Sequence, residues 1–169
     1  MKDAKSNHEI WIANDHRGYP LKCLITNYLT KNDIPFKDIG SNSEETVRYP
    51  YYAATVAHAV SQGIVKRGIL ICSTGIGMSI MANKFKGARA SLCTDTYMAK
   101  MTRKHNDSNI LCLGGKITGD FEAIAILDIW LNTDFEGERH SLSLKEIAEV
   151  EDVIYNPEDW VPNFRINKE

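Results

Sequence analysis

The chain has 169 residues, a length typical of one domain that can bury its own core. Its apolar fraction of 43% and charged fraction of 25% are those of an ordinary globular protein, which excludes a disordered or fibrous chain. The net charge of -2 provides no broad basic face for phosphate backbones, so we expect no nucleic-acid partner.

Short strand-like runs alternate with helical stretches along the chain. The predicted strands are Glu9–Asn14, Pro35–Ile39, Gly68–Cys72, Ala88–Cys93 and Asn109–Leu113. The predicted helices are Pro20–Asn32, Tyr51–Gln62, Gly75–Phe85, Asp95–Lys104, Asp120–Leu131 and Ser143–Val153. Several strands are continuously apolar, as doubly covered parallel strands are. The pattern therefore predicts an α/β fold, a three-layer αβα sandwich with a five-stranded parallel, Rossmann-like sheet.

We expect a single α/β domain over residues 9–154, after a flexible N-terminal segment, residues 1–8. Beyond the last predicted helix, an extended tail occupies residues 155–169. The tail lacks a periodic pattern but contains Trp160 and Phe164, which offer aromatic surface. We predict that it docks on the domain or on a partner subunit.

The cysteines, the apolar runs and the start of the chain indicate the compartment. Cys23, Cys72, Cys93 and Cys112 form no Cys-x-x-Cys pair, which disfavours both a zinc site and a disulfide framework. No apolar run approaches the roughly 18 residues of a membrane helix, and the start of the chain lacks a hydrophobic signal core. The sequence therefore predicts a cytoplasmic protein without membrane contact.

In a sheet of this kind, ligands bind at the carboxyl ends of the strands. The segments expected there are Asn14–Gly18, Cys72–Ser79, Thr94–Asp95 and Gly114–Lys116. Gly75 and Gly77 allow a sharp turn that points consecutive N–H groups into one space, as in an anion-binding nest. Dinucleotide binding fits poorly, because Ile80 stands where a third glycine is needed, and no Walker-type phosphate loop occurs.

Cys72 ends the third predicted strand, directly before the start of a helix. The positive end of the helix dipole favours a thiolate there, so Cys72 is a candidate base. The alternative is that Cys72, like Cys93 and Cys112, is a small buried apolar residue.

These motifs together resemble the ribose-5-phosphate isomerase B family, which is grouped with the galactose-6-phosphate isomerase subunits. The resemblance covers roughly residues 9 to 150. The matching segments are Asp15-His16-x-Gly18, Tyr49-Pro50-x-Tyr52-Ala53, Gly68-Ile69-Leu70-Ile71-Cys72-x-Thr74-Gly75-x-Gly77-x-Ser79, Ala82-Asn83-Lys84, His105-Asn106-x-x-Asn109 and Gly137-x-Arg139-His140.

The resemblance implies interconversion of an aldose phosphate and a ketose phosphate through a cis-enediolate, without metal or cofactor. It assigns Cys72 as the base, His105 with Asp15 to ring opening, and Thr74 to proton movement on the substrate oxygens. Asn106 matches a substrate contact. The nest expected to hold the enediolate oxygen comprises Ser73, Thr74, Gly75, Ile76 and Gly77.

At the phosphate end, the resemblance assigns binding to His16 and Arg139, but the chain departs from the family at two further positions. Lys116 stands where arginine is frequent, which keeps the charge and loses the two-pronged guanidinium. Ser143 stands where a further arginine is common. These departures motivate an alternative substrate, the six-carbon galactose 6-phosphate or allose 6-phosphate, beside ribose 5-phosphate.

Two further expectations concern partners and turnover. The resemblance implies a homodimer whose sites draw residues from both chains, with a tetramer as the larger alternative. A non-catalytic sugar-phosphate sensor is the other class of function to weigh. Retention of both the base and the ring-opening histidine argues against it, since a sensor needs neither.

Overall fold

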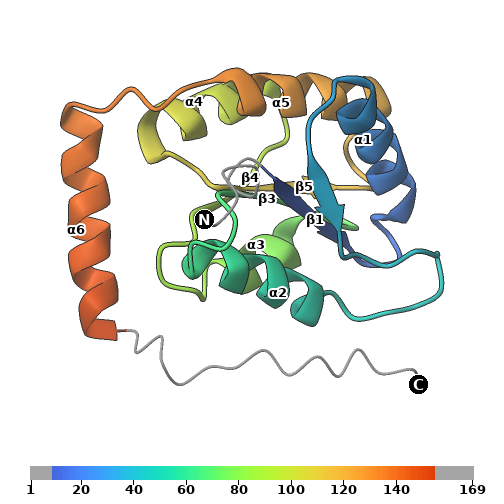
Figure 1. The fold of residues 1–169 in the computed structure, drawn as a ribbon, viewed down its shortest axis with the longest axis horizontal. Helices are drawn as coiled ribbons and strands as arrows, with labels where there is room; N and C mark the ends of the chain where they lie inside the picture. The colour runs from blue at the N-terminus through green and yellow to red at the C-terminus, as the bar shows by residue number, and fades with distance from the viewer. Residues whose placement is uncertain (1–8, 155–169) are drawn as a thin grey trace, which may run out of the picture.

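Five parallel strands form one sheet in the order β2-β1-β3-β5-β4 in the computed structural model, which describes residues 9–154 (Figure 1). The strands are β1 (Ile10–Asn14), β2 (Phe36–Asp38), β3 (Arg67–Cys72), β4 (Ala90–Leu92) and β5 (Ile110–Gly114). The helices are α1 (Tyr19–Lys31), α2 (Tyr49–Ser61), α3 (Ile76–Ala82), α4 (Thr96–Asn106), α5 (Asp120–Asn132) and α6 (Arg139–Ile154). The predicted fold class is thereby confirmed. The expectations for residues 1–8 and 155–169 lie outside the described residues.

Strand order changes direction between β1 and β3. From β1 the chain moves outward to β2 on one side, whereas from β3 it moves to β4 at the other edge of the sheet and then returns to β5, between β3 and β4. In register, Asn14 at the end of β1 lies beside Ile71, and Cys72 at the end of β3 lies beside Gly114. The loops after β1 and β3 therefore diverge to opposite faces at this point, which is where open α/β sheets form ligand crevices.

The sheet is covered on both faces, and each face has its own apolar core. Helices α1, α4 and α5 pack on one face, where Ile12, Ile69 and Leu111 are fully buried, together with Trp130 of α5 (Figure 1). Helices α2 and α3 cover the other face. Because neighbouring residues of a strand point to opposite faces, burial on both sides requires the continuous apolar runs read from the sequence.

Several helix ends carry residues that commonly start or stop helices. Pro50 lies in the first turn of α2, which begins at Tyr49 rather than at the predicted Tyr51. Asp95 caps α4 by accepting a 2.8 Å hydrogen bond from the backbone N–H of Met98. Gly63 follows α2 with φ +66°, the left-handed conformation favoured after a helix.

Helix α3 ends at Ala82, before the predicted Phe85. The side chain of Asn83 donates to the carbonyl oxygen of Ala90 and accepts from its N–H, both at 2.8 Å. Asn83 thus bonds β4 through both of its amide groups, as a neighbouring strand would.

Helix α6 begins at Arg139, four residues before the predicted Ser143. Gly137 and Glu138 have φ of +72° and +47°, and this left-handed turn starts the helix early. The N–H groups of His140 and Ser141 then donate 3.0 Å bonds back to the carbonyl oxygens of Gly137 and Glu138.

Most of α6 stands away from the rest of the domain (Figure 1). Its last turns reach the loop before β4, where Glu151 accepts a 2.9 Å bond from the N–H of Gly87. A cavity of about 490 Å³ lies along the helix and is lined by Ile147, Val150 and Ile154, among others. These three side chains are 45%, 56% and 65% exposed, so α6 carries an apolar stripe that the described chain leaves uncovered.

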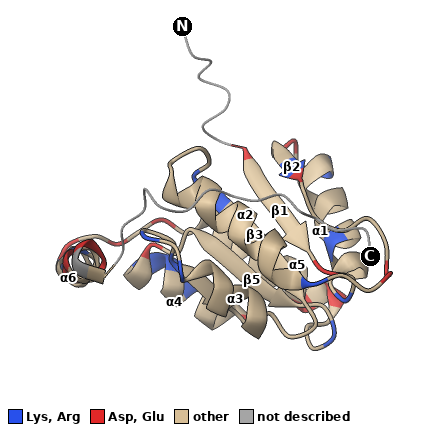
Figure 2. Cartoon of the chain, turned by 90° about the horizontal axis from the view of Figure 1, so that it is seen from below, with Lys and Arg blue, Asp and Glu red and all other residues tan. Residues whose placement is uncertain are grey.

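Charge is distributed unevenly over the described residues. Figure 2 shows acidic residues along α6 and basic residues on α4. Within the same residues, no helix combines the length and the apolar character needed to cross a bilayer.

Candidate active site

The loop after β1 holds Asp15 beside the end of β3. The N–H of Asp15 donates to the carbonyl oxygen of Ile71 at 3.1 Å. Its buried carboxylate accepts from the N–H groups of Arg17 and Gly18 at 2.9 and 3.1 Å. A Cβ on Gly18 would lie 2.6 Å from the Ile71 carbonyl oxygen, so only glycine permits this close approach. Asp15 is therefore fixed at the point where strand order changes direction.

Cys72 is the last residue of β3, and its side chain meets the turn that follows. The N–H of Gly75 donates to Cys72 Sγ at 3.2 Å. Gly75 has φ +77°, and a Cβ there would lie 2.5 Å from Leu92 Cδ1. The backbone of the turn therefore directs one N–H donor at the sulfur of the candidate base.

The loop after β5 is bonded to the same turn. Gly115 N–H donates to the carbonyl oxygen of Cys72 at 2.7 Å, and Lys116 N–H donates to that of Ser73 at 3.0 Å. The backbone of Lys116 thus adjoins the turn, while its side chain is exposed.

Two aromatic side chains border this region. His16 Nδ1 lies 3.1 Å from the carbonyl oxygen and 3.3 Å from the nitrogen of Val47, which fixes the ring on the segment before α2. The ring of Tyr49 packs on Gly77, where a Cβ would lie 2.7 Å from Tyr49 Cζ. The sequence placed Tyr49 in a family motif, but its contact with the turn was missed. We call Asp15, His16, Cys72–Gly77 and Lys116 the carboxyl-edge cluster.

The other predicted site residues lie at the opposite side of the sheet, near the amino ends of the strands. His105 and Asn106 end α4, and the carbonyl oxygen of Asn106 accepts a 2.9 Å bond from Arg89 Nε, directly before β4. Helix α4 begins at the carboxyl edge and runs back for 11 residues, about 16 Å. His105 therefore lies near the amino ends of the strands, whereas Cys72 lies at a carboxyl end.

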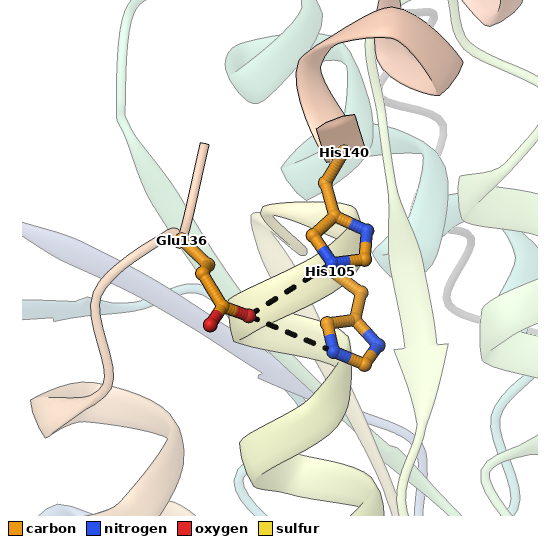
Figure 3. A group of neighbouring side chains, drawn as sticks. All are labelled: His105, Glu136 and His140. Atoms are coloured by element: carbon orange, nitrogen blue, oxygen red, sulfur yellow. Dashed lines mark ion pairs between the residues drawn. The ribbon is translucent and has the colours of Figure 1, made fainter. Parts of the chain in front are cut away.

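His105 contacts two residues that the predicted site did not include, Glu136 and His140 (Figure 3). Both imidazoles place Nε2 3.8 Å from the same carboxylate oxygen, Oε2 of Glu136. The rings are stacked, with centroids 4.2 Å apart and planes inclined by 15°. The Gly137-x-Arg139-His140 motif was the available sequence signal, but its distance from His105 in the chain concealed the contact.

Positive side chains surround this group. Arg139 Nε donates to His140 Nε2 at 3.3 Å, and Lys104 Nζ lies 3.9 Å from the other carboxylate oxygen of Glu136. Partial burial lowers the pKa of His140, with smaller contributions from His105 and Arg139. We call His105, Asn106, Glu136, Arg139 and His140 the amino-edge cluster. Ser143 is exposed one turn further along α6.

One chain thus divides the predicted site between two clusters at opposite edges of its sheet. The base candidate and its nest belong to the carboxyl edge, and the ring-opening candidate belongs to the amino edge. Cys93 and Cys112 belong to neither cluster. Burial raises the pKa of Cys93 to about 12 and raises that of Cys112 as well, which suits them to the interior rather than to catalysis.

Comparison with known proteins relates the chain to one family. A ribose/galactose isomerase family model matches residues 10–147. Ribose-5-phosphate isomerase B of Escherichia coli K12 is 44% identical over 137 residues, which cover 81% of this chain and 92% of that protein.

Solved structures give the same relationship. The ribose-5-phosphate isomerase B of Clostridium thermocellum superposes with a TM-score of 0.85 at 45% identity, covering 87% of this chain and 99% of that one. The Mycoplasma genitalium enzyme with bound ribulose 5-phosphate superposes with a TM-score of 0.81 at 37% identity, covering 85% and 96%. The chain belongs to the ribose/galactose isomerase family.

Proposed function

We propose that this protein interconverts ribose 5-phosphate and ribulose 5-phosphate. The observation that carries the proposal is the Gly75 N–H directed at Cys72 Sγ, at the point where the strand order changes direction. The relatives named above support the five-carbon substrate, and one of them was solved with ribulose 5-phosphate. We expect the reaction in the cytoplasm, in keeping with the free state of all four cysteines.

Cys72 acts as the base on the open-chain sugar. Its thiolate removes the proton from carbon 2 of the aldose, and the electron pair forms the carbon 1–carbon 2 double bond of a cis-enediolate. The same thiol returns the proton to carbon 1, while Thr74 assists transfer of the hydroxyl proton between oxygens 2 and 1. Electrons are redistributed within the sugar, so the reaction has no net oxidant.

The turn after β3 stabilises the charge that develops on the enediolate oxygen. The left-handed conformation at Gly75 lies within the proposed nest of N–H groups from Ser73 to Gly77. A well-placed donor to such an oxygen contributes about 3 to 4 kcal/mol to the transition state. This contribution appears only as charge develops, so it raises kcat.

His105 opens the furanose ring together with Asp15. Ring opening requires a proton to leave oxygen 1 and another to reach the ring oxygen, and an imidazole is suited to such transfers near neutral pH. Because His105 and Cys72 lie at opposite edges of one sheet, we assign the two residues of a working site to different subunits.

The protein is therefore a homodimer in this proposal. The uncovered stripe of Ile147, Val150 and Ile154 on α6 supports it, since an apolar helix face beside a cavity marks an interaction surface. An isologous pair would place the amino-edge cluster of one chain beside the carboxyl-edge cluster of the other, twice per dimer.

Exposed basic residues of both clusters bind the phosphate in this proposal. Arg139 of the amino-edge cluster offers a two-pronged guanidinium, and Lys116 of the carboxyl-edge cluster offers a point charge. His16 and Asn106 supply further polar contacts to the sugar phosphate. Ser143 contributes a hydroxyl where a third cation is common.

A coupled assay on ribose 5-phosphate, galactose 6-phosphate and allose 6-phosphate tests the proposal. We expect the highest kcat/KM on ribose 5-phosphate and loss of turnover in Cys72→Ala. Cys23→Ala, at a half-buried thiol of α1, is the matched control and should retain activity. A higher kcat/KM on a six-carbon sugar would reassign the substrate, and unchanged turnover of Cys72→Ala would remove Cys72 from the mechanism.

A further inference from the structure

His105, Glu136 and His140 bring three metal-binding side chains into one place (Figure 3). They come from the end of α4, the loop before α6 and the first turn of α6. One ligand atom from each lies within 4.8 Å of the others. We propose that this group binds a divalent transition-metal ion, of which Zn²⁺ is the best match.

The spacing leaves room for an ion between the side chains. At 3.8 Å from both imidazole nitrogens, the Glu136 oxygen is too far away to accept a hydrogen bond from either ring. Two ligands on one tetrahedral Zn²⁺ lie about 3.4 Å apart when each bond is about 2.0 to 2.1 Å. Each Glu136–imidazole distance must therefore shorten by about half an ångström, and the two ring nitrogens, which lie within 4.8 Å of one another, must approach by up to about 1.4 Å through side-chain rotation to bind one ion.

The donor set suits zinc chemically. Two imidazole nitrogens and one carboxylate form a three-ligand set that leaves the fourth tetrahedral position open to water. The carboxylate also offsets part of the ion's charge. His140 Nε2 accepts a hydrogen bond from Arg139, so an ion must displace Arg139 to bind the one lone pair of this nitrogen.

The backbone holds the three ligands near one another before any ion arrives. Glu136 N–H donates to the carbonyl oxygen of Lys104 at 3.0 Å, which ties the loop to the last turn of α4. Gly137 turns the chain with φ +72°, and His140 N–H bonds back to it at 3.0 Å. The positive charges of Lys104 and Arg139 repel a bound cation, so we expect a Kd in the micromolar range rather than a lower one.

Occupancy of this site inhibits the isomerase, a consequence that rests on the proposed function. An ion on His105 Nε2 takes the lone pair that ring opening uses. Zn²⁺ should therefore suppress turnover of ribose 5-phosphate, and a chelator should restore it.

Direct measurement of metal binding to the full-length protein tests the site independently of the isomerase activity. Co²⁺ serves as the spectroscopic probe and Zn²⁺ as the calorimetric one, with His140→Gln and Glu136→Gln as the disrupting variants. We expect one ion per chain, and at least about tenfold weaker binding in either variant. Glu138→Gln removes the same charge from the same loop without touching the group, and should bind as the wild type does.

Inhibition is then measured against each protein's own metal-free rate. Zn²⁺ inhibition should weaken in His140→Gln and Glu136→Gln but persist in Glu138→Gln. Equal inhibition in all of them would place the ion on Cys72 instead and overturn the inference. Isomerase activity without metal binding would overturn the site and leave the proposed function standing. Metal binding that His140→Gln abolishes supports the site whatever the activity.

Discussion

The backbone N–H of Gly75 points at the sulfur of Cys72, 3.2 Å away, from a residue with φ +77°. The left-handed conformation turns the chain back toward the end of β3 and directs this donor at the thiol. It also begins the run of N–H groups that leads into α3. One glycine therefore serves both the base and the proposed oxyanion nest.

Gly75→Ala should damage stability and turnover together. An alanine there should lower the free energy of unfolding by about 1 to 2 kcal/mol, because the left-handed backbone conformation is unfavourable for it. Its Cβ would also lie 2.5 Å from Leu92 Cδ1 and 3.0 Å from the backbone of Leu113, which costs about 1 to 3 kcal/mol more as overpacking. Displacing the donors should lower kcat about a hundredfold. Urea unfolding and steady-state kinetics measure the two effects.

Gly87→Ala is the matched control for this substitution. Gly87 has φ +75°, but a Cβ there would meet nothing within 4 Å. It should lose only the backbone contribution, about 1 to 2 kcal/mol, and keep wild-type kcat. If the two variants were equally active, the turn at Gly75 would have no role in turnover.

The division of the site between two edges predicts complementation between inactive variants. Cys72→Ala and His105→Asn should each be inactive alone. After the two are unfolded together and refolded, half of the dimers are mixed, and each mixed dimer contains one intact site out of two. We therefore expect roughly one quarter of the wild-type activity. Recovery is measured by the coupled assay after dilution from urea.

A second mixture controls for non-specific rescue. Cys72→Ala with Thr74→Ala carries both defects in the carboxyl-edge cluster, so every site of a mixed dimer is defective. This mixture should recover nothing. Absence of recovery in the first mixture as well would mean that each chain supplies its own complete site.

The sequence predicted the sheet and the turn at Cys72 because both depend on local patterns. Continuous apolar runs indicated the buried strands, and Gly75 and Gly77, shortly after Cys72, indicated a sharp turn. The division of the site is not local. The contacts of His105 with Glu136 and His140 depend on where α4 ends relative to α6, which the sequence pattern does not encode.

Two helix boundaries were predicted wrongly, one because of side-chain hydrogen bonds and one because of an unusual backbone conformation. Asn83 ends α3 early because its amide groups bond β4, an interaction between segments seven residues apart. Helix α6 starts early because Glu138 adopts φ +47°, which its residue type does not suggest. Helix propensity describes neither the hydrogen bonds of Asn83 nor the left-handed backbone at Glu138.

Lys116 should govern substrate affinity rather than the chemical step. Its backbone is fixed to Ser73, and its exposed side chain would contact the phosphate, which does not change during the reaction. Loss of a charged hydrogen bond in Lys116→Ala should raise KM for ribose 5-phosphate roughly tenfold, with little change in kcat. Lys116→Arg should lower KM, because the guanidinium binds a phosphate with two parallel bonds.

The control for Lys116 is Lys100→Ala, which removes an exposed lysine of α4 outside both clusters. Its KM should match the wild type in the same buffer. A fall in kcat without a change in KM for Lys116→Ala would contradict a phosphate-binding role and place Lys116 in the chemical step.

The buried thiol of Cys93 should make the protein less stable in alkali. Burial, with a smaller contribution from Asp95, raises its pKa from 9.0 to about 12 in the folded chain. Between these values the unfolded chain loses a proton that the folded chain keeps, so the free energy of unfolding falls as pH rises. The full contribution is present below pH 9 and is lost by about pH 12. Urea unfolding in reducing buffer across this window should therefore give a shallower dependence of the unfolding free energy on pH for Cys93→Ala, by up to about 1.4 kcal/mol per pH unit.

Ala99→Gly, a non-titrating change in the same apolar core, should lower stability at every pH and leave the dependence on pH as in the wild type. Parallel curves for the wild type and Cys93→Ala would show that Cys93 releases its proton equally readily in both states, because only a difference in proton binding between the two states produces a slope.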